Sequence, residues 1–110
     1  MERERIKPIT LTDTNTDKVY TLEFNRETIV QAEDSGFDIS AATRKPLKSF
    51  ETLWCYAFKM HHPEVTPKEA KAILDQVGEI TEALSNRLYE LYQAGANNLR
   101  VENPTVAVTL

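Results

Sequence analysis

The chain has 110 residues, a net charge of −4 at pH 7 and one cysteine. This length predicts a single domain with a modest core, the lone cysteine excludes an intrachain disulfide, and the acidic balance argues against a nucleic-acid-binding surface. No apolar run approaches the ~20 residues of a membrane span, and no secretory signal follows Met1, so we expect a cytoplasmic protein without a membrane partner.

Two segments near the N-terminus have the alternating pattern of β-strands, residues 6–13 and 18–24. The segment between them, residues 13–17, is dense in turn-forming residues, so the two strands should form a hairpin. Their apolar faces are expected to hold Ile9, Leu11, Tyr20, Leu22 and Phe24. Because a lone hairpin is marginally stable in water, this face should cover the helices that follow.

A short helix is predicted next, over residues 25–35. Asn25 can cap its N-terminus by accepting a backbone N–H, and Glu27 suits the positive end of the helix dipole. Gly36 is placed to end the helix in the left-handed conformation. The side chains expected to reach the core from this region are Ile29, Val30, Ala32, Phe37 and Ile39.

The most hydrophobic stretch, residues 46–62, predicts the central helix. Pro46 suits its first turn, and Pro63 marks its end. The face at helical spacing holds Leu47, Phe50, Leu53, Trp54, Ala57, Phe58 and His61. We expect the other elements to pack around the large rings of Trp54 and Phe58.

Two further helices are predicted, over residues 66–77 and 79–94, separated by a break at Gly78. Thr66 and Glu69 can form a capping box at the start of the first one, with Pro67 at its first position. Gly95 should end the second. The inward positions of the two helices are Ala70, Ile73, Leu74 and Val77, followed by Ile80, Leu84, Leu88, Leu91 and Tyr92.

The predicted fold is therefore α+β, with an N-terminal β-hairpin packed on a bundle of about four α-helices. Residues 1–95 form the single domain. Residues 96–110 form an extended C-terminal tail that either adds a strand to the hairpin or stays flexible until a partner binds it.

No pattern in the sequence indicates a catalytic, cofactor or metal site. His61 and His62 are adjacent, so on a helix they would point roughly 100° apart and chelate one ion poorly. Cys55 in the middle of a helix is expected to be a small buried hydrophobic residue rather than a nucleophile. The carboxylates at Glu23, Glu27, Glu33 and Asp34 could in principle do acid–base chemistry, but a solvated helix face is favoured. With three glycines and no glycine-rich phosphate loop, the sequence favours a binding or assembly protein over an enzyme.

Three stretches together resemble the small tail assembly chaperones of long-tailed phages and prophages of Gram-positive bacteria. They are residues 20–28 with Ala32-Glu33 and Gly36-Phe37, residues 53–62, and residues 87–92. The resemblance implies a non-enzymatic protein that binds the long helical tape measure protein, keeps it soluble and helps to recruit tail tube subunits. Another phage structural adaptor, such as a head–tail connector component, is the main alternative, and a small enzyme or regulator is the third.

A chaperone of this kind needs exposed apolar side chains, and a helical client is most simply bound by helix-in-groove contact. Tyr56, Met60, Tyr89 and Val106 lie off the main apolar stripes or in the tail, so they are the candidate partner-binding residues. Ordinary peripheral packing is the alternative reading of each. Repeated binding along a long client would also favour homo-oligomers.

Overall fold

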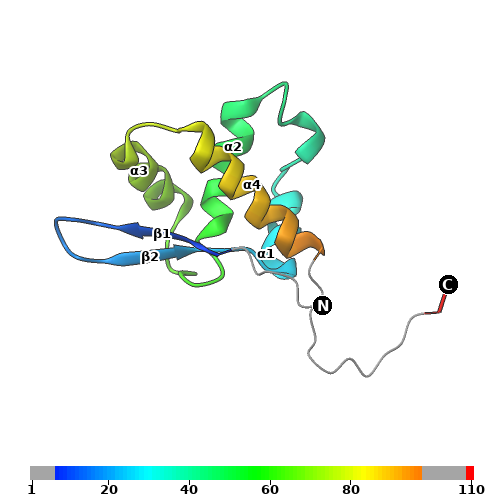
Figure 1. The fold of residues 1–110 in the computed structure, drawn as a ribbon, viewed down its shortest axis with the longest axis horizontal. Helices are drawn as coiled ribbons and strands as arrows, with labels where there is room; N and C mark the ends of the chain where they lie inside the picture. Colours follow the sequence, from blue (N-terminus) through cyan, green and yellow to red (C-terminus); the bar gives the residue numbers. More distant parts are fainter. Residues whose placement is uncertain (1–6, 98–108) are drawn as a thin grey trace.

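The computed structural model describes residues 7–97 and 109–110. An antiparallel β-hairpin is followed by four α-helices, which confirms the predicted α+β fold (Figure 1). The elements are β1 (Ile9–Thr12), β2 (Val19–Leu22), α1 (Arg26–Asp34), the 3₁₀ helix η1 (Ile39–Ala41), α2 (Pro46–Ala57), α3 (Pro67–Val77) and α4 (Glu82–Asn97). Most of the predicted tail lies outside the described residues, so its added strand or flexibility stays a prediction.

The hairpin is shorter than predicted, and its register pairs Ile9 with Leu22 and Thr12 with Val19. Leu22 is fully buried, whereas Val19 is 49% exposed. The hairpin therefore presents one apolar face to the helices, and its turn extends beyond them (Figure 1). Beyond β2, Phe24 is also buried in the core, as predicted.

Helix α1 begins and ends where the local signals predicted. The Asn25 side chain accepts the Thr28 N–H at 2.8 Å, and the Asn25 N–H donates to the Thr28 hydroxyl at 3.0 Å. Gly36 follows the helix with φ +108°, in the left-handed region that glycine tolerates. The predictions for Val30 and Ile39 were wrong, since both side chains are more than 40% exposed.

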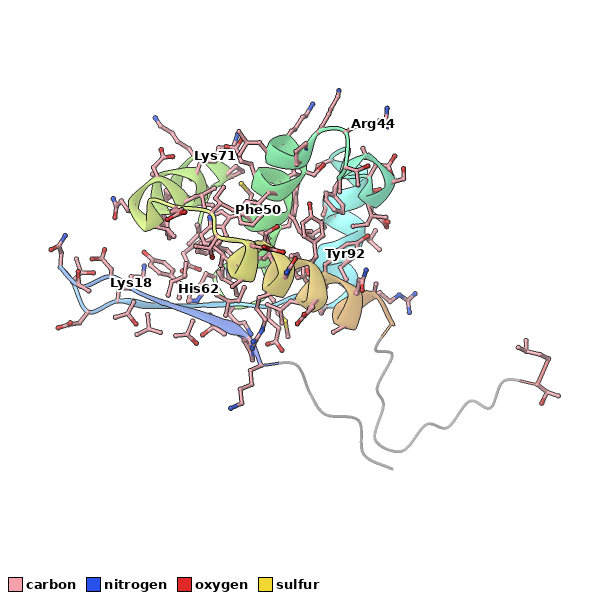
Figure 2. The ribbon with its side chains drawn as sticks, turned by 45° about the horizontal axis from the view of Figure 1, so that its top comes forward. Lys18, Arg44, Phe50, His62, Lys71 and Tyr92 are labelled. Carbon is pink, nitrogen blue, oxygen red and sulfur yellow. The ribbon has the colours of Figure 1, made fainter. Side chains whose placement is uncertain are left out.

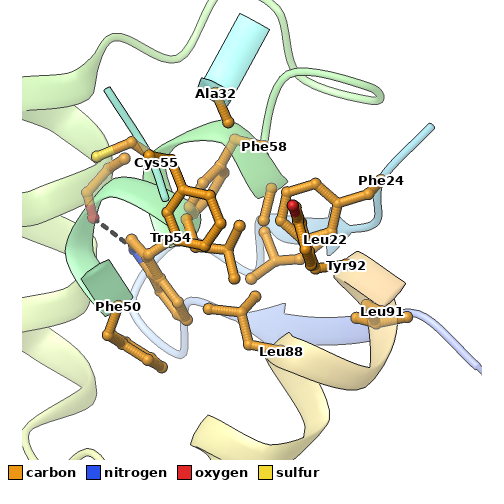
Figure 3. Close-up of a cluster of buried hydrophobic side chains, with 14 of the residues drawn as sticks. Leu22, Phe24, Ala32, Phe50, Trp54, Cys55, Phe58, Leu88, Leu91 and Tyr92 are labelled. Atoms are coloured by element: carbon orange, nitrogen blue, oxygen red, sulfur yellow. Dashed lines mark hydrogen bonds between the residues drawn. The ribbon is translucent and has the colours of Figure 1, made fainter. Parts of the chain in front are cut away.

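Helix α2 lies at the centre, with α1 on one side and α3 on the other, and α4 crosses it (Figure 1). Trp54 and Phe58 are fully buried, and the Trp54 indole Nε1–H donates to the carbonyl of Ala70 on α3 at 2.8 Å (Figure 3). The prediction that Leu47 faces inward was wrong, because this side chain in the first turn is 61% exposed.

Helix α2 ends at Ala57, five residues before the predicted end. The carbonyl of Ala57 accepts the N–H of Glu23, the residue after β2, at 3.1 Å. The chain then turns, and the His62 N–H donates to the carbonyl of Phe58 at 2.7 Å. His61 is therefore exposed rather than part of the inward helical face, and the expectation for it was wrong.

The sequence predicted the ends of α3 correctly but not the start of α4. Thr66 caps α3 by accepting the Glu69 N–H at 3.1 Å, but the Glu69 carboxylate accepts the Thr66 hydroxyl at 3.1 Å instead of a backbone N–H. Gly78, with φ +89°, ends α3 as predicted. Helix α4 starts later than predicted, because the Thr81 hydroxyl accepts the Leu84 N–H at 3.1 Å and serves as its cap.

The prediction that Gly95 ends the last helix was wrong, because it lies inside α4 and is buried. A Cβ added there would lie 2.9 Å from Ile29 Cδ1 and 3.0 Å from the carbonyl oxygen of Phe24. Glycine is thus required for the close approach of α4 to α1 and to the segment after β2.

Candidate functional site

The four predicted partner-binding residues do not form one exposed patch. Tyr56 on α2 and Tyr89 on α4 are half-buried and pack against the core. Burial also raises the pKa of the Tyr89 hydroxyl. Met60, in the turn after α2, is 38% exposed. Val106 lies outside the described residues. Of the three described candidates, Met60 alone is more than a third exposed.

Sequence periodicity missed other exposed apolar side chains because it assigned them to the core. Leu47 precedes Trp54 by two helical turns on the same face of α2, and Val77 follows Ala70 by two turns on α3. Trp54 and Ala70 meet at the α2–α3 contact. Leu47 and Val77, each two turns away from that contact, are 61% and 41% exposed. Ile80, in the segment between α3 and α4, is 38% exposed. The apolar faces of α2 and α3 therefore continue past their packed region.

The two histidines join β2 to the end of α2 instead of facing one another. The Thr21 N–H donates to Nε2 of His62 at 2.9 Å, while Nε2 of His61 lies 2.8 Å from Oε1 of Glu23. The Tyr20 ring meets the His62 ring edge-on, with centroids 5.3 Å apart (Figure 2 shows His62 beside the strands). In this arrangement Nε2 of His62 accepts a strand N–H, a structural role that sequence reasoning did not assign.

Cys55 lies in the buried interior, 6% exposed. Its Sγ is 3.8 Å from the carbonyl oxygen of Pro67, a weak thiol contact. Burial raises the pKa of the thiol, so the reactive thiolate is disfavoured. This environment is that of a small core residue, as the sequence indicated.

The remaining candidate groups are dispersed. Glu27, Glu33 and Asp34 are exposed on α1, and Glu23 contacts His61. Within residues 7–97 and 109–110, no three His, Cys, Asp or Glu side chains are grouped to hold a metal ion. None of the helices in that part of the chain combines the length and hydropathy that a membrane span requires.

A hollow of about 250 Å³ lies between η1 and the first turns of α2, and sequence reasoning missed it. Its lining includes the cations Arg44, Lys45 and Lys48 together with Ser49 and Asp38. The basic residues on both sides of Pro46 were the available signal in the sequence, but our sequence analysis assigned them no role. The hollow exists because η1 folds back beside the start of α2.

Comparison with known protein families identifies a family for this chain. Residues 4–108 match the family described as "Domain of unknown function (DUF5055)". Neither the curated proteins nor the solved structures contain a match. Since the match spans nearly the whole chain, the protein belongs to the DUF5055 family.

Proposed function

We propose that this protein is a non-enzymatic tail assembly chaperone of a long-tailed phage or prophage, acting in the host cytoplasm. It binds the tape measure protein before the tail tube forms and helps to recruit the tail tube protein. The observation that carries the proposal is the resemblance of residues 20–37, 53–62 and 87–92 to such chaperones. These stretches supply β2, α1, the end of α2 and the middle of α4, so the resemblance concerns the body of the fold.

The distribution of apolar side chains supports a binding role. A protein that keeps an apolar helical client soluble needs accessible apolar surface of its own. Large side chains more than a third exposed are present on several elements of the described chain. They are Val19, Val30, Ile39, Leu47, Met60, Val77, Ile80 and Leu110.

Among the candidate partner-binding residues, Met60 is the one whose contact with a client can be tested most cleanly. Met60 follows the end of α2, is 38% exposed and forms no part of the buried core. A methionine side chain is flexible and adapts to varied apolar partners. Tyr56 and Tyr89 are half-buried, so their substitution would disturb packing as well as binding.

Co-expression with the tape measure protein of the same genome tests the proposal. We expect the client to move from the insoluble to the soluble fraction and to co-purify with this protein. Recovery of an insoluble client with this protein running alone would contradict the proposal, and a defined ring without the client would favour the head–tail connector alternative.

A matched pair of variants tests the contact. Met60→Gln should reduce the amount of client recovered, whereas Val19→Gln, on the hairpin, should leave it unchanged. Both side chains are exposed, so neither substitution should unfold the domain. Equal loss in the two variants would contradict the assignment of Met60 to the contact.

A further inference from the structure

An exposed apolar side chain lies among cations at the start of α2. Leu47 is 61% exposed, more than any other large apolar side chain in residues 7–97. Arg44 and Lys45 precede it, Lys48 follows it, and all three cations are exposed. No ion pair in the described part of the chain involves these cations, and Figure 2 shows Arg44 pointing away from the fold. We call these four residues the basic patch, an apolar centre with a positively charged rim.

A second group, of opposite charge, lies where α3 connects to α4 along the outside of the fold (Figure 1). Val77, the last residue of α3, is 41% exposed, and Ile80 in the connection is 38% exposed. Three exposed carboxylates lie within two residues of them in the sequence, at Asp75, Glu79 and Glu82. The ion pairs of the described residues include none of these carboxylates. We call these five residues the acidic patch.

The two patches are opposite in charge and alike in composition. Residues 39–50 contain three cations and no carboxylate, whereas residues 72–86 contain three carboxylates and no cation. Each group surrounds large apolar side chains that water reaches in the single chain. An apolar centre with a polar rim is the usual arrangement of a protein–protein interface. Because both patches are exposed, they do not cover one another within one chain, but two copies can do so.

We propose that the basic patch of one copy of this chain binds the acidic patch of a second copy. Leu47 of one copy then packs against Val77 and Ile80 of the other, which removes these side chains from water. The charges favour a second copy as the occupant, because the same chain carries both halves of the contact in equal number. The attraction is local, since whole chains of net charge −4 repel one another.

Analytical ultracentrifugation of the purified chain, over a series of protein concentrations, tests the contact without the tape measure protein. We expect reversible self-association that weakens between about 0.1 M and about 1 M salt, because the Debye length falls from about 10 Å to about 3 Å. Net charge alone predicts the opposite, since salt would screen the repulsion between two acidic chains. A chain that stays monomeric, or whose association strengthens with salt, would overturn the proposal.

Charge reversal distinguishes the two patches from the rest of the surface. Lys48→Glu and Glu79→Lys should each weaken self-association about tenfold, since each removes one exposed attraction and adds a repulsion of similar size. Lys71→Glu on α3 and Glu90→Lys on α4 make the same charge changes at exposed positions outside the patches, so they should leave the association unchanged. The contact is disproved if these controls lose as much as the patch variants.

A mixture of the two patch variants gives the sharpest test. The Lys48→Glu chain keeps a native acidic patch and the Glu79→Lys chain keeps a native basic patch, so together they should form complexes that contain one copy of each. Leu47→Gln, which changes no charge, should also weaken self-association of the otherwise native chain. A mixture that associates no better than its components would overturn the proposal.

The tape measure protein is the other possible occupant of these patches. If the native chain is monomeric and the patch variants lose the co-expressed tape measure protein, the patches bind the client and the proposed self-association is wrong. That result would leave the proposed chaperone function standing, so the failure of one proposal can be told from the failure of the other.

Discussion

Replacing His62 by alanine should destabilise the fold through the junction of β2 and α2. The ring accepts the Thr21 N–H at 2.9 Å, and its loss leaves a part-buried donor without a partner, at a cost of about 1–3 kcal/mol. The edge-on contact with Tyr20, at 5.3 Å between centroids, adds about 0.5–1.5 kcal/mol. Because water can reach this part-buried donor, we expect a total of about 2 kcal/mol, or roughly 8 °C in Tm for a domain of this size.

Urea unfolding followed by the fluorescence of Trp54 measures this change, since Trp54 is the one tryptophan and is fully buried. His61→Ala is the matched control. Its side chain is exposed and its contact with Glu23 is a surface pair, which contributes about 0–1 kcal/mol. His62→Gln, which keeps an acceptor at the end of the side chain, should recover part of the loss. Equal destabilisation by His61→Ala and His62→Ala would refute the assigned role of His62.

Three further predictions concern stability and reactivity. Gly95→Ala should lower the free energy of unfolding by about 1 kcal/mol. The added Cβ costs about 1–3 kcal/mol in steric overlap with the Phe24 backbone, which exceeds the gain of about 1 kcal/mol in helix propensity. A variant that is more stable in urea unfolding would contradict this prediction. Asn25→Ala should lower the free energy of unfolding by about 1 kcal/mol, and Asn25→Asp should lower it much less, as judged by Tm. Equal losses of stability in the two variants would exclude a capping role for Asn25. Burial raises the pKa of the Cys55 thiol, so the folded state holds this proton more tightly than the unfolded chain; its stabilising contribution is present below the unfolded pKa and is lost as pH rises through the folded pKa. Labelling of Cys55 by a disulfide reagent should accordingly be slow in the native protein and fast in urea, and rapid native labelling would show that the thiol is accessible.

Local signals predicted the parts of the fold that depend on neighbouring residues. The caps at Asn25 and Thr66 and the glycines at Gly36 and Gly78 act within one turn of chain, and each was placed correctly. The buried rings of Trp54 and Phe58 followed from helical periodicity. Such features need no knowledge of which element lies opposite.

Features set by distant contacts could not be read from the sequence. Helix α2 ends at Ala57, where the carbonyl accepts the N–H of Glu23 from the end of the hairpin. Gly95 looked like a helix end, but its role depends on the approach of Phe24. Periodicity placed Leu47 in the core because it identifies a face of a helix and not the length over which a partner covers it.

The candidate functional residues show the same difference between features set by neighbouring residues and features set by distant contacts. The half-buried positions of Tyr56 and Tyr89 agree with their places beside the main stripes, but the sequence could not say how exposed each would be. The hollow beside α2 combines Asp38 with Lys48 and Ser49, which only the path of η1 brings together. Its basic residues were visible in the sequence, whereas their position beside η1 was not.

The proposed chaperone role is tested most directly by light scattering on the size-exclusion peak of a co-expressed complex with the tape measure protein. The account predicts a soluble particle whose mass equals one client plus several copies of this 12.5 kDa chain. A peak that contains this protein alone, with the tape measure protein left in the insoluble fraction, would contradict it.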